Sequence, residues 1–214
     1  VAHDIVERAQ SALDRMLADD WNGSLPDEDA VALESVLHVR GRPALRVIGE
    51  RLESLEHHPG SEFWQDLIGD YEDRIVAATA ATGAVIVSWF SSGNPPWVQG
   101  TAWLTAPNRV VTNRHVLMSG RPESHLVASA SDGSAPKIKS GIELYLDFTH
   151  DHRAPGVQTR RRVTSVLFVA KADDPVDIAV LQIEAFAERT PLLLAPVGAA
   201  TPGNLVVVGH PSPM

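Results

Sequence analysis

The sequence predicts an α-helical N-terminal region followed by an antiparallel β-barrel. Up to about residue 74, apolar residues recur every three or four positions, which is typical of amphipathic helices. Afterwards they occur in short runs separated by Gly, Pro, Asn and Asp, with no long helical pattern between them, which favours antiparallel strands. Charge changes at the same point: residues 1–74 carry 17 acidic and 7 basic side chains, and residues 75–214 carry 10 and 11. We therefore expect two domains, at 1–74 and 75–214.

Composition restricts the class of protein. With 214 residues, 44% of them apolar, the chain is able to bury a core, and no run approaches the roughly 18 apolar residues of a membrane-spanning helix. The net charge of −9 argues against nucleic-acid or anionic-membrane surfaces. The absence of cysteine excludes disulfides, thiol nucleophiles and cysteine-based zinc sites. Because no signal peptide is visible after Val1, we expect a cytoplasmic rather than a secreted protein, although the sequence leaves export open.

Four helices are predicted in the first domain. Their expected positions, separated by loops that contain Pro or Gly, are 2–17, 27–37, 43–55 and a fourth that opens at 59–61 and carries residues 63–71. Short loops between helices favour an antiparallel bundle. Two interpretations remain open for it: a stabilising or linking domain, and a regulatory module whose acidic surface selects a basic partner. His57 and His58 lack a third ligand at suitable spacing, so we expect them to be solvated rather than to bind metal.

Seven short strands are predicted in the second domain. Each is an apolar run bounded by turn residues, and together they occupy 84–89, 101–104, 109–112, 142–146, 163–169, 178–183 and 205–208. Strands of this length and spacing are typical of a barrel or sandwich.

Residues 100–117, GTAWLTAPNRVVTNRHVL, place a histidine just past the end of a strand. Thr112 and Asn113 are expected to cap a short turn that carries His115, with two apolar residues behind it. Such a histidine is held rigidly while its ring is able to face a cleft. The alternative is an ordinary histidine in a helical cap.

Asp177 stands at the start of a second apolar strand, within the stretch DDPVDIAVL. A carboxylate there could accept a hydrogen bond from an imidazole, fix its tautomer and stabilise the imidazolium. The alternative for a single Asp before a strand is a loop cap.

The two motifs belong to a longer pattern, in which TAWL, VVTNRHVL, DIAVL and LVVVGHP follow one another. This pattern resembles the trypsin-like serine peptidases of the chymotrypsin fold, particularly the bacterial glutamyl-endopeptidase-like branch. The resemblance spans roughly residues 82–211 and implies a double β-barrel. It also implies that His115 is the general base, that Asp177 orients it, and that a nucleophilic serine follows both in the chain.

The serine is the point at which the sequence departs from that family. The family's nucleophile lies in a G-x-S-G motif, and the sequence has none. Ser91, Ser92 and Ser134 stand in the wrong chain order, and Ser212 only follows a Gly-His-Pro strand end. We therefore expect the serine beyond residue 214, in C-terminal polypeptide that completes the second barrel, and we expect this portion alone to be inactive.

Two functions are weighed on these observations. The first is the N-terminal part of a serine endopeptidase acting on a protein or peptide substrate. The second is a catalytically silent binding module that engages a basic partner through its acidic helices. Neither requires a cofactor or a metal. The triplet His150-Asp151-His152 has the spacing of a chelate but lacks an evident third ligand, so we favour a polar turn there.

Overall fold

The structure is a computed structural model of the chain. It describes residues 11, 15, 26, 28–29, 44–58, 64–128, 135–151, 159–194 and 206–210.

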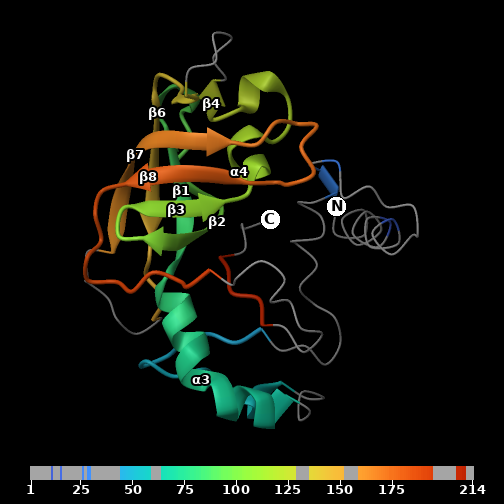
Figure 1. The fold of residues 1–214 in the computed structure, drawn as a ribbon, viewed down its shortest axis with the longest axis vertical. Coiled ribbons are helices and arrows are strands. Elements are labelled where there is room, and N and C mark those ends of the chain that lie inside the picture. Colours follow the sequence, from blue (N-terminus) through green and yellow to red (C-terminus); the bar gives the residue numbers. More distant parts are fainter. Residues whose placement is uncertain are drawn as a thin grey trace.

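Within these residues, six strands form a closed antiparallel barrel in the order β1-β2-β3-β8-β7-β6 (Figure 1). The barrel strands are Thr82–Trp89 (β1), Trp97–Ala106 (β2), Arg109–Thr112 (β3), Ile142–Asp147 (β6), Arg160–Val169 (β7) and Ala179–Ile183 (β8). A separate pair is formed by Val127–Ala128 (β4) and Lys137–Ile138 (β5). The helices whose bounds fall within the described residues are Gln65–Ala80 (α3) and Arg114–Met118 (α4), with 3-10 turns at Leu55–His57, Phe90–Ser92 and Pro122–Ser124.

The barrel confirms six of the seven predicted strands. Its core follows from side-chain alternation, since β6 and β8 place every second residue in the interior. The interior is aliphatic and includes Val85, Val87, Leu104, Val110, Leu144, Leu146, Val163, Val166 and Leu181. Phe148 and Phe186, just after β6 and β8, pack together with ring centroids 5.2 Å apart.

The seventh predicted strand, at 205–208, is wrong for residues 206–208, which adopt no strand. A closed barrel has no edge strand for this segment to join. It is attached instead through Thr101 on β2, whose Oγ1 accepts from the His210 main-chain N–H at 2.9 Å and also lies 3.3 Å from the His210 carbonyl oxygen.

Helix α3 confirms the fourth predicted helix and continues beyond the expected boundary at residue 75. It reaches Ala80 and passes through buried Ala81 directly into β1, where the Thr82 hydroxyl donates to the Ala78 carbonyl at 2.8 Å. Figure 1 shows α3 extending away from the barrel, whereas α4 lies beside the strands. The division into domains at 74/75 stays a prediction. None of the described helices is long and apolar enough to cross a membrane.

The first two predicted helices lie almost wholly outside the described residues. Ser11, Arg15, Glu28 and Asp29 are described, and all four are helical. The Arg15 guanidinium forms an ion pair with Asp29, with Nη2 2.5 Å from Oδ2. The antiparallel bundle stays a prediction.

The third predicted helix, at 43–55, is wrong. Residues 44–54 are irregular, with an isolated bridge between Val47 and Leu52. Between them the backbone turns through positive φ angles of 62° at Gly49 and 60° at Glu50. A helix requires negative φ at every residue, so this turn excludes one. The spacing of apolar residues alone could not reveal this turn.

The turn is stabilised by Asp151, a buried residue that follows β6. Its carboxylate accepts from the main-chain N–H of Gly49 at 3.0 Å and of Glu50 at 2.9 Å. Glu72 on α3 adds to this attachment, since its carboxylate accepts from the Leu52 N–H at 2.9 Å. The segment is therefore fixed to both the barrel and α3, and Asp151 acts as its clamp.

Asp151→Ala should lower the free energy of unfolding by about 1 to 3 kcal/mol, because it removes the charged acceptor that holds two main-chain N–H groups in the turn. Urea unfolding followed by circular dichroism measures this. The exposed Asp173→Ala is the control and should change stability by less than about 0.5 kcal/mol. Equal stability of the two variants would contradict the clamp.

A second carboxylate, Asp147 at the end of β6, joins β6 to the start of β7. Its Oδ1 accepts from the Thr149 N–H at 3.0 Å and from the Thr159 hydroxyl at 2.8 Å, and its Oδ2 accepts from Arg160 Nε at 3.0 Å. Burial raises the pKa of Asp147, but these hydrogen bonds outweigh it and lower the pKa from 3.8 to about 2. The folded protein therefore favours the ionised form.

This shift predicts an acid-dependent loss of stability. Since the folded pKa lies below the unfolded one, the stabilisation is complete above about pH 4 and is lost as the pH falls towards 2. Asp147→Asn should cost about 1 to 2 kcal/mol at pH 7, and the difference from the parent should shrink by pH 2.5. Urea unfolding at the two pH values tests this, and an undiminished difference at pH 2.5 would count against it.

Candidate active site

His115 lies in the first turn of α4, immediately after β3. Its side chain is buried, as are Val116 and Leu117 behind it. Helix α4 packs closely on β2 at Gly100, where a Cβ atom would lie 2.6 Å from Val116 Cγ2. Because Val116 is fixed in the core, a larger residue at position 100 would displace the turn that carries His115.

Asp177 lies in the loop between β7 and β8, two residues before β8 begins. β3 and β8 are antiparallel neighbours, with Thr112 opposite Ala179. The end of β3 therefore adjoins the start of β8, and the residues just beyond these ends are brought together. Asp177 is partly exposed beside the buried His115.

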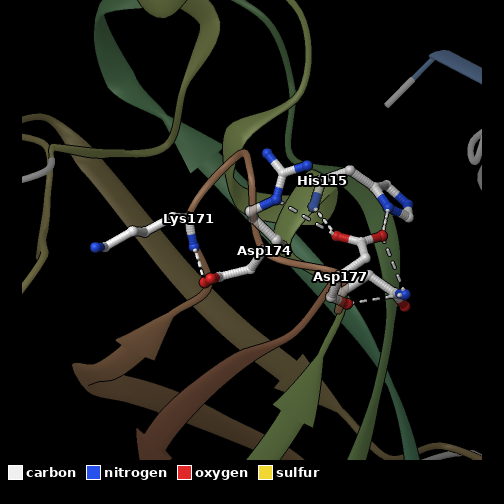
Figure 2. Close-up of polar contacts among 6 residues, drawn as sticks. His115, Lys171, Asp174 and Asp177 are labelled. Carbon is white, nitrogen blue, oxygen red and sulfur yellow. Dashed lines mark hydrogen bonds and ion pairs between the residues drawn. The ribbon is translucent and has the colours of Figure 1, made fainter. Parts of the chain in front are cut away.

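The two predicted site residues are in direct contact (Figure 2). His115 Nδ1 lies 2.5 Å from Asp177 Oδ2, and the His115 main-chain N–H donates to Oδ1 at 3.0 Å. Asn113 also donates from Nδ2 to Oδ2 at 3.3 Å, and Arg114 Nε lies 3.9 Å from Oδ1. Both carboxylate oxygens are thus held by donors from one short stretch of chain.

These donors determine the charge of Asp177. Burial raises its pKa, but hydrogen bonds from the His115 ring and main chain, the positive charge of protonated His115, and the Asn113 amide outweigh burial and lower the pKa below its ordinary value. An ionised carboxylate only accepts, so His115 Nδ1 carries the proton in the neutral ring. The lone pair is then on Nε2, the nitrogen suited to act as a base.

Asp174 shapes the loop that carries Asp177 (Figure 2). Its carboxylate accepts from the Lys171 main-chain N–H at 2.6 Å, and its own N–H donates to the Lys171 carbonyl at 3.2 Å. The base of the loop is closed by a 2.8 Å bond from the Ala170 N–H to the Ile178 carbonyl. Asp174 thereby limits the positions that Asp177 is able to take.

Of the serines considered from the sequence, the two that the structure describes are bonded to a residue outside this pair. Ser91 and Ser92 lie in the 3-10 turn after β1, where both hydroxyls bond to Trp89: Nε1 donates to Ser91 at 2.7 Å, and Ser92 donates to the Trp89 carbonyl at 2.7 Å. Ser134 and Ser212, also considered from the sequence, lie outside the described residues.

The histidines considered as metal ligands from the sequence are those at 57–58 and in the triplet at 150–152. Within the part of the chain that the structure describes, no group of three His, Cys, Asp or Glu side chains is arranged to hold a metal ion. Asp151 is engaged in the clamp, and Arg189 Nη2 lies 3.3 Å from His150 Nδ1. His152 is outside the described residues.

Three contributors to the site were not identified from the sequence. Asn113 was expected to cap α4, but it makes no cap hydrogen bond and contacts Asp177 instead. Gly100 and Asp174 act through close packing and through a loop hydrogen bond. The sequence shows that an Asn stands at the start of a helix. It does not show that Asp177 is the partner of this Asn, because that contact depends on the pairing of β3 with β8.

Comparison with protein families identifies a match over the C-terminal part of the chain. Residues 100–214, more than half of the chain, match the model of the trypsin-like peptidase domain, and the match includes both His115 and Asp177. A search of curated proteins found no match.

Asp174→Ala should loosen the loop and weaken the contact between Asp177 and His115. Loss of one charged acceptor is worth about 1 kcal/mol, which corresponds to about fivefold faster hydrogen exchange at the His115 main-chain N–H. Exchange monitored by NMR measures this, with the adjacent exposed Asp173→Ala as control. Unchanged exchange in Asp174→Ala would show that the loop holds Asp177 without it.

Proposed function

The chain belongs to the trypsin-like peptidase domain family, and from this we propose that it contributes the base and its orienting carboxylate to a serine endopeptidase. His115 is the general base and Asp177 orients it. The observation that carries the proposal is that one carboxylate contacts both Nδ1 and the main-chain N–H of the same histidine. Such a contact fixes the ring orientation as well as its tautomer.

In the proposed mechanism, His115 Nε2 accepts the proton of a serine hydroxyl as its Oγ attacks the substrate carbonyl carbon. Asp177 stabilises the imidazolium that forms. The imidazolium then protonates the leaving amine, which departs and leaves an acyl-serine. Water, deprotonated by His115, hydrolyses this ester and regenerates the serine.

The serine in this proposal lies beyond residue 214, in a G-x-S-G motif that also provides the oxyanion hole. Exposed large apolar side chains, two of them beside Asp177, support a further packing partner. Val176 and Ile178, on either side of Asp177, are 49% and 38% exposed. Val207 is 76% exposed and Leu193 98%. We propose that a second barrel, formed by the C-terminal remainder of the polypeptide, covers exposed apolar side chains such as these.

The N-terminal region has a separate proposed role. Its excess of acidic residues, 17 against 7 basic ones in residues 1–74, suits a basic protein partner. In an active peptidase this region would act as a regulatory module.

Labelling with a fluorophosphonate probe tests the enzymatic proposal on the polypeptide of the complete reading frame. We expect a serine to be labelled, and His115→Ala to reduce labelling by at least about 100-fold because the base is lost. Asp177→Asn should lower the rate of peptide cleavage by about 10³ to 10⁴.

His125→Ala is the matched control, since His125 lies in the turn before β4 and outside the pair. It should label as the parent does. Labelling that survives His115→Ala would contradict the assignment of the base. Complete absence of labelling, with the protein folded, would favour the catalytically silent binding module.

A further inference from the structure

Asn113 occupies the N-cap position of α4 but does not use its side chain as a cap. Its backbone is extended, with φ −76° and ψ 146°, as a capping residue requires, yet the side chain makes no cap hydrogen bond. Asn is among the residues that cap helices most effectively. The side chain therefore bonds to another partner and leaves α4 without a side-chain cap from this residue.

That partner is Asp177. Asn113 Nδ2 lies 3.3 Å from Oδ2 and 3.4 Å from the main-chain oxygen of Asp177. Both oxygens only accept hydrogen bonds, so the side of the amide that faces them must be the NH₂ group. A single NH₂ group thus bridges the side chain and the main chain of a residue 64 positions away.

The bridge acts on the oxygen that contacts the histidine ring. Oδ2 lies 2.5 Å from His115 Nδ1, while Oδ1 accepts from the His115 main-chain N–H at 3.0 Å. With Asn113 on Oδ2 and His115 on both oxygens, rotation of the carboxylate would break at least one of these bonds. Among the described residues, Arg114 also approaches the pair, with its Nε 3.9 Å from Oδ1.

We propose that Asn113 is a positioning residue, whose amide holds the Asp177 carboxylate so that Oδ2 stays against His115 Nδ1. The inference rests on the proposed function in treating His115 as the base. The geometry of the His115–Asp177 pair, on which the proposal depends, is measurable without a nucleophile.

A purely structural role for Asn113 predicts a different response to mutation. Asp caps helices about as well as Asn, so Asn113→Asp preserves the capping capacity of position 113. The same change replaces the NH₂ donor by an acceptor, which cannot bond to the oxygens of Asp177. Asn113→Asp therefore separates positioning from capping, and Asn113→Ala removes both.

The experiment is NMR on the full 214-residue chain, with melting followed by circular dichroism to monitor folding. In Asn113→Asp we expect the hydrogen-bonded Nδ1 proton of His115 to broaden beyond detection at pH 7. In Asn113→Ala we expect that proton to exchange at least about fivefold faster. In Asn113→Ala the titration midpoint of the Asp177 carboxyl should also rise by about half a pH unit, because a hydrogen bond to its ionised form is lost.

Asn94→Asp is the control, since it makes the same change of charge in an exposed loop between β1 and β2 and should leave all three signals unaltered. Retention of the parental Nδ1 signal in Asn113→Asp would overturn the proposal. So would an unchanged Asp177 midpoint in Asn113→Ala. Neither readout needs catalysis. Failure of probe labelling would therefore contradict the proposed peptidase function but would leave the test of Asn113 as a positioning residue unaffected.

Discussion

The pairing of β3 with β8 closes the barrel and sets Thr112 opposite Ala179. Both site residues lie just beyond the paired ends of these strands, so this pairing brings together two chain segments that are 62 residues apart. Neither segment forms the site by itself. The acceptor for the buried His115 lies in the β7–β8 loop, and the His115 donors to Asp177 lie in α4. Every feature of the site, including Gly100 packed against α4 and Asp174 within the loop, maintains this one alignment of strand ends.

Within the described residues, carboxylates held by several hydrogen-bond donors occur at Asp147, Asp151 and Asp177. Asp147 joins β6 to β7, Asp151 clamps the N-terminal segment, and Asp177 holds His115. For Asp147 and Asp177, burial favours the protonated form, and hydrogen bonds from main-chain and side-chain groups oppose it. For Asp147 and Asp177 the hydrogen bonds win, since the pKa of both lies below the ordinary value. The arrangement that stabilises the fold is thus also the one that keeps a charge beside the histidine.

Much of the barrel could be predicted from the sequence, because burial on one face of a strand imposes alternation that β6 and β8 display directly. The motifs likewise predicted His115 and Asp177 as site residues, and the structure places the two side chains in contact, while their catalytic roles stay a proposal. The errors arose where a local pattern depends on a distant partner. Residues 43–55 have helical spacing, but the positive φ angles at Gly49 and Glu50 are held by Asp151. Asn113 has the type and place of a cap, and only the β3–β8 pairing directs it to Asp177. Residues 205–208 have strand composition, but the closed barrel offers them no edge.

The Asp151 clamp also has a consequence for the order of events during synthesis. Gly49 and Glu50 leave the ribosome about one hundred residues before their acceptor, which at usual elongation rates is a delay of roughly 5 to 20 seconds. Closing a short loop takes microseconds or less, so the N-terminal segment has time to sample many conformations before Asp151 exists. Its final left-handed turn is therefore set late, by the barrel. A chaperone or another early-binding protein would meet residues 44–58 in a form that the finished molecule no longer presents.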